Sequence, residues 1–277
     1  MFENVIGHER QKNIITSMIN AGTFSHANLF VGKRGIGKKL FANEIAKVLL
    51  NTNNLETCLD YKYICKDEGK KDLSVEKIRK ELLEDVYIRP AMSDKKVYII
   101  DDADNLNPAA QNALLKTLEE PPKYVHIIMI AESSSTFLST IISRINITTF
   151  DGISKENIKK YIKQKYNVDF NENILDFIGG SIGLAENIIN DNLFDKLKKV
   201  EDVYNAVIKK DTVKAMLSSS DNIFSESNML EYFEYLFYKS KNYNICKYVE
   251  KANIRLKNNG NYDIVIDNMI IKLIDNI

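Results

Sequence analysis

A glycine-rich segment, GKRGIGKK at residues 32–39, carries the residues with the clearest potential for chemistry. Its spacing nearly matches G-x-x-x-x-G-K-[ST], in which backbone N–H groups cradle phosphates and the lysine reaches the terminal phosphates. The residues that fit this pattern or support its backbone are Gly32, Gly35, Gly37 and Lys38. Lys39 stands where a Ser or Thr hydroxyl normally holds Mg²⁺, which an ammonium group cannot do. The segment therefore predicts a degenerate phosphate-binding loop, and the alternative is a simple tight turn between a strand and a helix.

Two adjacent carboxylates, Asp101 and Asp102, end an apolar run at residues 96–102. An acidic residue at the end of a strand beside a phosphate loop holds the Mg²⁺ shell, and we predict that role for Asp101. The next position usually carries a Glu that polarises the attacking water, whereas Asp102 is one methylene shorter. A misplacement of ~1 Å can cost ~100-fold in rate, so the pair predicts a site weakened for hydrolysis. The alternative is a solvated strand end.

Three apolar runs are predicted as strands, at residues 28–32, 96–102 and 125–131. The first leads through the glycine loop into a helical pattern. Asn107 is a good helix cap, Pro108 fits the first helical position, and Pro121 with Pro122 stops that helix. This alternation predicts an α/β fold with a parallel sheet.

The pattern becomes helical after residue 150, where apolar residues recur at three and four spacing. We therefore predict an α/β domain at residues 1–150, a helical domain at 151–210 and a second helical domain at 211–277. Residues 218–228, SSSDNIFSESN, are predicted as a linker or loop.

The composition excludes several classes of protein. Thirty-eight basic and 38 acidic residues give zero formal charge, which argues against tight, unassisted nucleic-acid binding. The three cysteines are sparse and odd in number, as in a reduced intracellular chain. The sequence shows neither a signal-peptide h-region nor an apolar run of the ~20 residues that span a bilayer. We expect a cytoplasmic protein.

Three segments in order resemble the AAA+ clamp-loader family of bacterial DNA polymerase III. They are HANLFVGKRGIGKK from His26, AQNALLKTLEEPP at residues 110–122 and STIISRI at residues 139–145. The resemblance implies a RecA-like domain, a helical lid and a helical collar. It also implies a hetero-pentamer that uses ATP binding to open a ring-shaped sliding clamp and close it around DNA. The implied partners are the gamma/tau and delta subunits, the sliding clamp and primer–template DNA within the assembly.

The resemblance also implies a role for Ser143 and Arg144. In this family a Ser-Arg-Cys motif of one subunit inserts its arginine into the nucleotide site of the next. Ser143 and Arg144 occupy that motif here, and Ile145 replaces the cysteine. Arg144 is thus expected to act in trans on the γ-phosphate of a gamma/tau neighbour, where a fixed guanidinium suits the developing negative charge. The alternative is an ordinary ion pair at a strand end.

Four positions depart from the ATP-hydrolysing members of the family. They are Lys39 for the metal-ligating hydroxyl, Asp102 for Glu, Glu132 near the polar γ-phosphate sensor, and Leu184 where a lid cation would reach the nucleotide. All four act against hydrolysis, which favours a non-hydrolysing, delta-prime-like subunit with at most weak or vestigial ATP binding. The alternatives are a gamma/tau-like motor subunit and an unrelated P-loop nucleotide kinase, which the scarcity of arginines after residue 150 disfavours.

No structural zinc is expected. Many relatives carry a four-cysteine module after the first helix, but only Cys58 and Cys65 lie in that stretch here, and zinc needs about four ligands. His26 is expected to pack near the loop. The lysine-rich segments 155–165 and 196–210 are interleaved with acidic residues and therefore predict solvated faces. The resemblance implies that Lys116 is the better DNA-facing candidate, because motor subunits of the family track DNA with that region.

Overall fold

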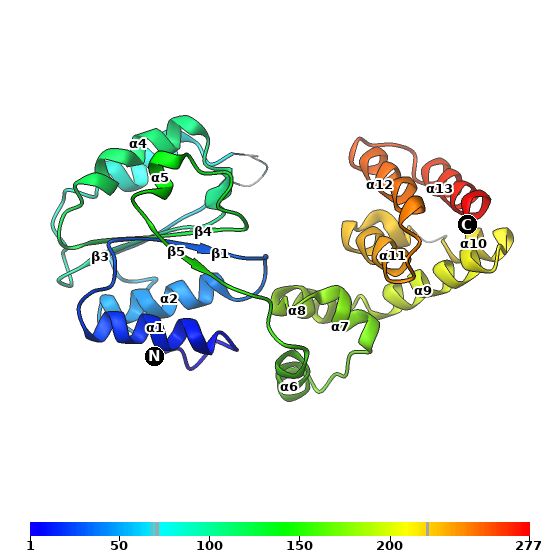
Figure 1. Ribbon diagram of the computed structural model, residues 1–277, viewed down its shortest axis with the longest axis horizontal. Helices are drawn as coiled ribbons and strands as arrows, with labels where there is room; N and C mark the ends of the chain where they lie inside the picture. The colour runs from blue at the N-terminus through cyan, green and yellow to red at the C-terminus, as the bar shows by residue number, and fades with distance from the viewer. Residues whose placement is uncertain (68, 70–71, 220–221) are drawn as a thin grey trace. The chain divides into compact units, whose positions relative to one another are not determined.

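The computed structural model describes residues 1–67, 69, 72–219 and 222–277 of the chain. Within these residues the N-terminal part is built on a five-stranded parallel sheet in the order β2-β3-β4-β1-β5 (Figure 1). The strands are β1 (Ala27–Val31), β2 (Tyr61–Ile64), β3 (Lys96–Ile100), β4 (Val125–Ala131) and β5 (Asn146–Thr149). The predicted α/β class with a parallel sheet is confirmed.

Helices cover both faces of this sheet. The helical elements are α1 (Glu9–Asn20), α2 (Lys38–Leu49), α3 (Val75–Ile78), the π-helical turn η1 (Arg79–Leu83), the 3₁₀ turn η2 (Ala103–Asn105), α4 (Pro108–Glu119), α5 (Ser139–Ile142) and α6 (Lys155–Tyr166). Helices α1 and α2 lie on one face, and α4 and α5 lie on the other (Figure 1). Each face has its own apolar core, with Phe30 and Phe41 central to the first and Leu114 and Ile127 to the second.

The three predicted strands are the central ones. Because helices cover both of their faces, β3 and β4 are buried along their whole length and β1 over all but its last residue. The edge strands β2 and β5 were not predicted. Each has four residues and is only partly buried or exposed, so neither produces the long apolar run that marks the central strands.

Helix α4 begins and ends where the sequence predicts. The Asn107 side chain accepts a hydrogen bond from the backbone N–H of Ala110 at 2.8 Å, and Pro108 is the first helical residue. The helix ends at Glu119, just before Pro121. The cap satisfies one of the N–H groups that a helix start leaves unpaired.

The carboxyl ends of the parallel strands meet at one edge of the sheet. Residues 32–37 follow β1, Asp101 follows β3 and Glu132 follows β4. Ligands of open α/β sheets bind in the crevice outside this edge. The topology thus brings together the glycine loop and the acidic residues that the sequence singles out.

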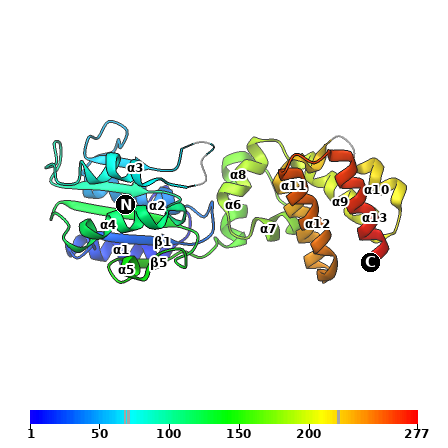
Figure 2. The same ribbon diagram turned by 90° about the horizontal axis from the view of Figure 1, so that it is seen from above.

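The chain packs into two compact units, Met1–Asp169 with Gly179–Gly183, and Phe170–Ile178 with Leu184–Ile277. The second unit contains α7 (Glu172–Ile178), most of α8 (Ile182–Asn190), α9 (Phe194–Ile208), α10 (Thr212–Ser218), the 3₁₀ turn η3 (Ile223–Ser225), α11 (Ser227–Lys239), α12 (Tyr243–Lys257) and α13 (Tyr262–Asn276). In it α11, α12 and α13 lie side by side (Figure 2). The predicted division into three domains is finer than these two units and stays a prediction. None of the described helices is long and apolar enough to cross a membrane.

The segment predicted as a linker or loop at residues 218–228 connects α10 to α11. Ser218 ends α10, Phe224 in η3 is 1% exposed, and α11 begins at Ser227. The Phe224 backbone N–H also donates to the Tyr262 hydroxyl at 3.1 Å. Of the two alternatives predicted, a loop is present, because the segment joins α10 to α11 through the turn η3. It is no free linker where it is described, since two apolar side chains, Ile223 and Phe224, hold the turn in the helical core, while residues 220–221 lie outside the described part.

Candidate functional site

The glycine loop at residues 32–37 joins β1 to α2, as a phosphate-binding loop does. Gly35 and Gly37 have φ angles of 72° and 96°, which favour glycine. A Cβ atom on Gly35 would lie 2.2 Å from the Ser181 hydroxyl oxygen, and the Gly35 carbonyl accepts a hydrogen bond from the Gly183 N–H at 2.8 Å. The loop is therefore shaped by its glycines and held by the 179–183 segment of the same unit.

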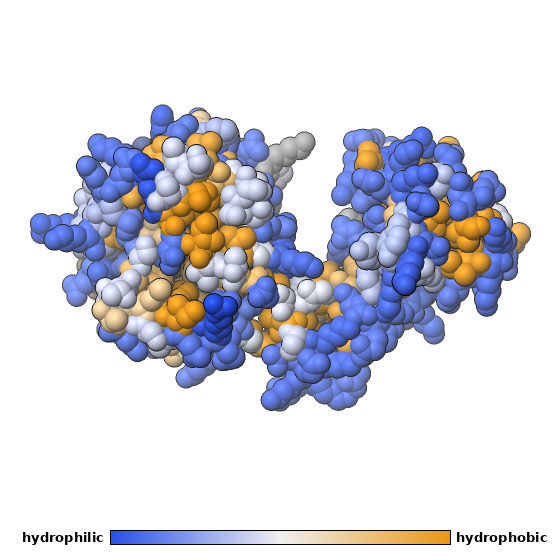
Figure 3. All heavy atoms as spheres, viewed as in Figure 1, coloured by the Kyte–Doolittle hydropathy of each residue, from blue (hydrophilic) through white to orange (hydrophobic). Residues whose placement is uncertain are grey.

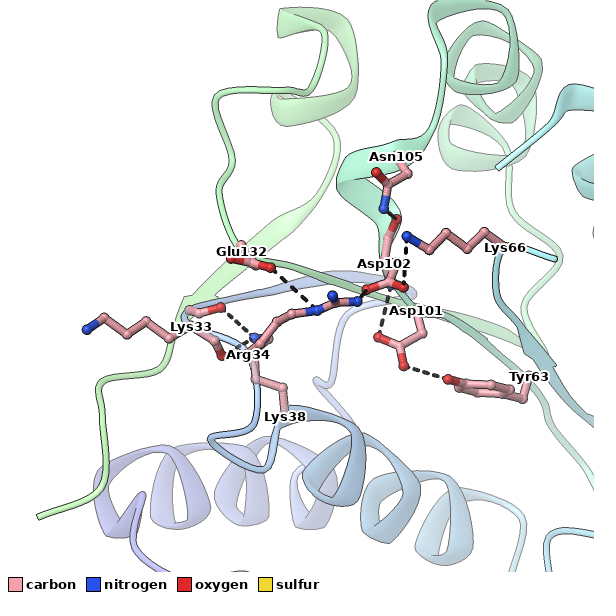
Figure 4. Close-up of polar contacts among 10 residues, drawn as sticks. Lys33, Arg34, Lys38, Tyr63, Lys66, Asp101, Asp102, Asn105 and Glu132 are labelled. Atoms are coloured by element: carbon pink, nitrogen blue, oxygen red, sulfur yellow. Dashed lines mark hydrogen bonds and ion pairs between the residues drawn. The ribbon is translucent and has the colours of Figure 1, made fainter. Parts of the chain in front are cut away.

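Lys38, the predicted phosphate-binding lysine, is 6% exposed and turned onto its own loop (Figure 4). Its ammonium group donates to the backbone carbonyls of Gly32 and Lys33. Burial lowers the pKa of Lys38, although attraction by Glu132 and Asp101 opposes this effect. The lysine thus binds the loop carbonyls at the position from which it would reach a phosphate.

Arg34, which the sequence reasoning did not single out, connects the loop to both neighbouring acidic strand ends (Figure 4). Its Nη2 lies 2.6 Å from Asp102 Oδ1, and its Nε lies 3.5 Å from Glu132 Oε1. The hydrogen bond from Arg34 to Asp102, together with their charge attraction, raises the pKa of the guanidinium. The sequence feature that could have indicated Arg34 is a basic residue at an unspecified position of the loop pattern, together with the acidic residues Asp102 and Glu132 after two strands.

Both carboxylate oxygens of Asp101, the predicted Mg²⁺ residue, have protein donors. The Tyr63 hydroxyl donates to Oδ2 at 2.5 Å, and the Asp102 backbone N–H donates to Oδ1 at 2.9 Å. Burial and the hydrogen bond to Asp101 raise the pKa of Tyr63 well above its usual range. Lys39 lies with its Nζ 3.8 Å from the centre of the same Tyr63 ring, a cation–π contact. Tyr63 belongs to β2, which explains why this partner escaped sequence reasoning.

Asp102 has a left-handed backbone, with φ 50° and ψ 39°, which aspartate tolerates better than most residues. Its carbonyl accepts from the Asn105 side-chain amide at 3.2 Å, and its Oδ2 lies 4.0 Å from Lys66 Nζ. The carboxylate therefore lies between two cations, Arg34 and Lys66. This turn directs the side chain to the glycine loop.

These contacts form one network, which we call the loop network, of Arg34, Lys38, Lys39, Tyr63, Asp101, Asp102 and Glu132. Its cations bind carboxylates, carbonyls or an aromatic ring of the chain itself. A phosphate-binding site instead presents cations and N–H groups to the phosphates and oxygen ligands to the metal. The arrangement is that of a phosphate loop whose charged groups are paired with one another.

Ser143 and Arg144 lie in the turn between α5 and β5, with partners outside the loop network. The Arg144 Nη1 donates to the Thr140 carbonyl at 2.8 Å and to the Ser143 hydroxyl at 3.0 Å. Its Nη2 lies 2.7 Å from Glu119 Oε1. The side chain is about one-third exposed, so the ion pair considered as an alternative is present on a surface-accessible arginine.

His8, and not His26, contacts the glycine loop. His26 packs with its Nε2 3.2 Å from the Leu118 carbonyl, but it directly precedes β1 and so lies at the end of that strand away from the loop. The expectation that it packs near the loop is wrong, because the strand between them spans the sheet. His8 contacts the loop instead, with its Nε2 2.8 Å from the Ile36 carbonyl.

Leu184, Lys116 and the two cysteines considered as zinc ligands are not among the residues of the loop network. Cys58 is buried and Cys65 half-buried, and no cluster of three metal-ligating side chains is found in the described residues, while the expectation of no zinc stays a prediction. Leu184 lies in the first turn of α8, and Lys116 is exposed on α4. Their proposed relations to nucleotide and DNA stay predictions.

A cavity of about 520 Å³ lies beside α1 and β5 in the same unit. Its wall includes His8, which contacts the loop, and Ile153. Asn28, which also lines it, is 1% exposed, and its Oδ1 has no hydrogen-bond partner among the described residues. His8 therefore links the cavity to the loop, and the loop residues 32–37 do not line it.

Comparison with known proteins identifies related sequences. A family model described as DNA polymerase III, delta subunit, matches residues 7–154. The DNA polymerase III subunit gamma of Buchnera aphidicola subsp. Acyrthosiphon pisum is 34% identical over 86% of this chain and 77% of its own length. The gamma/tau subunit of Mycoplasma genitalium is 30% identical over 93% of this chain and 51% of its own length. The chain therefore spans three quarters of the first relative and about half of the second.

A solved structure shares the fold. It is a DNA polymerase III gamma subunit-related protein from Thermotoga maritima, with a TM-score of 0.58 over 95% of this chain and 99% of that one. The sequence identity is 13%, so this likeness concerns the fold alone.

Proposed function

Because the chain belongs to the DNA polymerase III clamp-loader family of AAA+ proteins, we propose that it is a non-hydrolysing, delta-prime-type subunit of that assembly. It works in the cytoplasm with gamma/tau and delta subunits. Together they open the sliding clamp and load it onto primer–template DNA. Its own contribution is structural and allosteric, and it supplies an arginine to a neighbour's nucleotide site.

The loop network is the observation that carries this proposal. Mg·ATP needs a hydroxyl ligand after the loop lysine and a site without repelling charge. Here Lys39 stands at the hydroxyl position and lies on the Tyr63 ring, whereas each Asp101 oxygen accepts one hydrogen bond and keeps a further acceptor site. Glu132, paired with Arg34, adds a negative charge near the expected phosphates.

The strength of the Arg34 ion pair limits how much Arg34 can contribute to the proposed loss of nucleotide binding. The Arg34 side chain is 65% exposed, and exposed ion pairs are worth about 0–1 kcal/mol. Arg34 alone therefore cannot keep a tightly binding nucleotide out. The missing metal ligand at Lys39 and the Glu132 carboxylate remain when Arg34 moves away, so they carry most of the loss.

Arg144 is the residue through which this subunit acts on chemistry. A guanidinium presented to a phosphoryl group stabilises the negative charge that develops during transfer, and such fingers are worth ~10³–10⁵ in rate. The support is its match to the family's Ser-Arg-Cys motif and its exposure on the turn after α5. Ser143 accepts a hydrogen bond from Arg144 and helps to orient it.

A second candidate is an ATP-hydrolysing gamma/tau-like motor subunit. The names of the relatives favour it, as do the retained loop glycines and Lys38. The cavity beside His8 offers space for a nucleoside next to the loop. This candidate requires Lys38 to leave the loop carbonyls and Asp101 to bind the metal shell through its remaining acceptor sites.

Isothermal titration calorimetry of the isolated chain with Mg·ATP separates the two candidates. A non-hydrolysing subunit with the loop network gives no saturable heat up to millimolar nucleotide. The Lys38→Ala variant serves as the baseline and gives the same trace. Tight one-site binding that Lys38→Ala removes, together with hydrolysis of the bound ATP, would refute the proposal and favour the motor subunit.

A further inference from the structure

The Arg144 side chain is folded back onto its own helical turn. Thr140, whose carbonyl it contacts, lies four residues before it on α5, and Ser143 adjoins it. Glu119, the last residue of α4, contacts the other terminal nitrogen of the guanidinium. Both terminal nitrogens, which would bind phosphoryl oxygens, are thus occupied by groups of the free chain.

The position of Glu119 is fixed by the helix that carries it. Leu114 and Leu118 of α4 are buried in the core beneath the helix, and the prolines after Glu120 prevent its continuation. The carboxylate is therefore held where α4 ends beside α5. It is a built-in anion at the guanidinium of the proposed finger.

We propose that Glu119 is a positioning residue for Arg144, and this inference rests on the proposed function. In the free chain its carboxylate holds the guanidinium against α5. When a nucleotide-loaded neighbour docks, its γ-phosphoryl group replaces Glu119 on Nη2, while the Thr140 carbonyl guides the released side chain. Arg144 thus enters the neighbour's site by exchanging the Glu119 carboxylate for the γ-phosphoryl group.

The relative strengths of the two contacts support this exchange. The side chains of Arg144 and Glu119 are 34% and 49% exposed, so water and salt weaken their ion pair. A guanidinium bound to a phosphoryl group forms parallel charge-assisted hydrogen bonds, which are stronger. The carboxylate can therefore be displaced, yet it lowers the apparent affinity for the neighbour by about fivefold at most, the range of an exposed ion pair.

The test uses the full chain in a reconstituted assembly with a gamma/tau ATPase. The chain is titrated, and ATP hydrolysis gives its half-saturating concentration and the rate at saturation. Glu119→Ala should lower the half-saturating concentration about two- to fivefold and leave the saturating rate unchanged. Glu119→Gln should give a half-saturating concentration between those of wild type and Glu119→Ala, because its amide oxygen still accepts a hydrogen bond but carries no charge. Glu120→Ala, at the adjacent exposed residue, is the matched control and should behave as wild type.

A binding measurement shows whether Glu119 acts through Arg144. The affinity of the fluorescently labelled chain for the ATP-loaded neighbour is compared for Glu119→Ala with and without Arg144→Ala. The gain in affinity should vanish in the Arg144→Ala background. A gain that persists there, a Glu119→Ala variant that equals Glu120→Ala, or a fall in the saturating rate would each overturn the inference.

Failure of the inference can be told from failure of the proposed function. If Arg144→Ala alone leaves hydrolysis unchanged, the finger assignment is wrong and the role of Glu119 falls with it. If Arg144→Ala reduces hydrolysis but Glu119→Ala matches Glu120→Ala, only the positioning role is wrong.

Discussion

At the scale of single residues, Arg34 and Lys39 support the proposal that this loop keeps the shape of a phosphate loop without its ligands. The glycines and Lys38 preserve the turn, whereas Arg34 binds Asp102 and Lys39 lies on the Tyr63 ring. The site is changed by the charges of a few side chains.

A restored loop is expected to bind nucleotide. The triple variant Arg34→Ala, Lys39→Thr, Glu132→Asn removes the internal ion pairs, supplies a hydroxyl for Mg²⁺ and removes a repelling carboxylate. We expect it to bind Mg·ATP at least about tenfold more tightly than wild type, a difference of about 1.4 kcal/mol. Calorimetry measures this, and adding Lys38→Ala should abolish the gain.

Single variants give the matching control. Arg34→Ala alone should bind no better than wild type, because the metal ligand is still missing and Glu132 remains. Tight binding by Arg34→Ala alone would show that the arginine, and not the missing hydroxyl, closes the site.

Sequence reasoning anticipated these residues only in part. The spacing of Gly32, Gly37 and Lys38 predicts a strand, a loop and a helix, and all three are present. The roles of Arg34 and Tyr63 do not follow from chain spacing, because Arg34 contacts residues that follow β3 and β4, and Tyr63 lies on β2 beside β3. Contacts between distant segments require the fold.

At the scale of elements, buried polar side chains hold the loops that flank the strands. Asp60 is 2% exposed and precedes β2. Its carboxylate accepts hydrogen bonds from the backbone N–H groups of Ala91, Met92 and Ser93 at 2.7, 2.7 and 2.8 Å. Burial alone would raise the pKa of Asp60, but these three donors outweigh it and hold the pKa below its ordinary value.

Asp60→Asn should destabilise the first unit in a pH-dependent way. A carboxyl group whose pKa is lowered by folding contributes stability above its unfolded pKa of about 3.9 and loses it as the pH falls through the lower folded value. We expect Asp60→Asn to cost about 1–3 kcal/mol at neutral pH, with the gap to wild type narrowing in acid. Urea unfolding at a series of pH values measures this. Asp94→Asn, at a nearby exposed position, should show no such trend, and a pH-independent gap would contradict the account.

Gln111 attaches the turn that carries Arg144 to α4. It is 2% exposed, its amide donates to the carbonyls of Leu106 and Thr136, and its Oε1 accepts from the Leu138 N–H at 2.8 Å. Leu138 is the residue before α5. The buried side chain thus fixes the start of the helix that ends at the proposed finger.

Gln111→Ala should destabilise the chain by about 1–3 kcal/mol, because it leaves three backbone groups without partners. Denaturant unfolding measures the loss. Asn112→Ala, the exposed neighbour on the same helix, should change stability by less than about 0.5 kcal/mol. Equal effects of the two variants would show that the Gln111 contacts do not hold α5.

The elements themselves were predictable in proportion to their burial. Central strands and α4 follow from apolar runs, the Asn107 cap and the proline stop. The edge strands β2 and β5 have only four residues each. They adopt strand structure because they form hydrogen bonds with β3 and β1, and their own sequences lack the long apolar run of the central strands. Tertiary hydrogen bonding defines such strands.

At the scale of the whole molecule, the second unit exposes apolar side chains on α10 and α13. Helices α10 and α13 contact each other, and hydrogen bonds beside their ends join the same segments. Lys210 Nζ donates to the Ile277 carbonyl, and the Tyr262 hydroxyl donates to the Ser219 carbonyl. Hydrophobic side chains gather over them on the visible face (Figure 3). Val213 on α10 and Ile264 on α13 are 70% and 68% exposed. The collar role implied by the family resemblance stays a prediction for this unit.

DNA-stimulated ATP hydrolysis is measured for a reconstituted gamma/tau assembly in which this chain carries either Lys38→Ala or Arg144→Ala. If this chain acts through its finger and not through its own loop, Lys38→Ala leaves hydrolysis unchanged. Arg144→Ala then lowers turnover at the neighbouring site by about 10³-fold or more. Loss of activity with Lys38→Ala and full activity with Arg144→Ala would contradict the proposed function, because the chemistry would then lie in this chain's own loop.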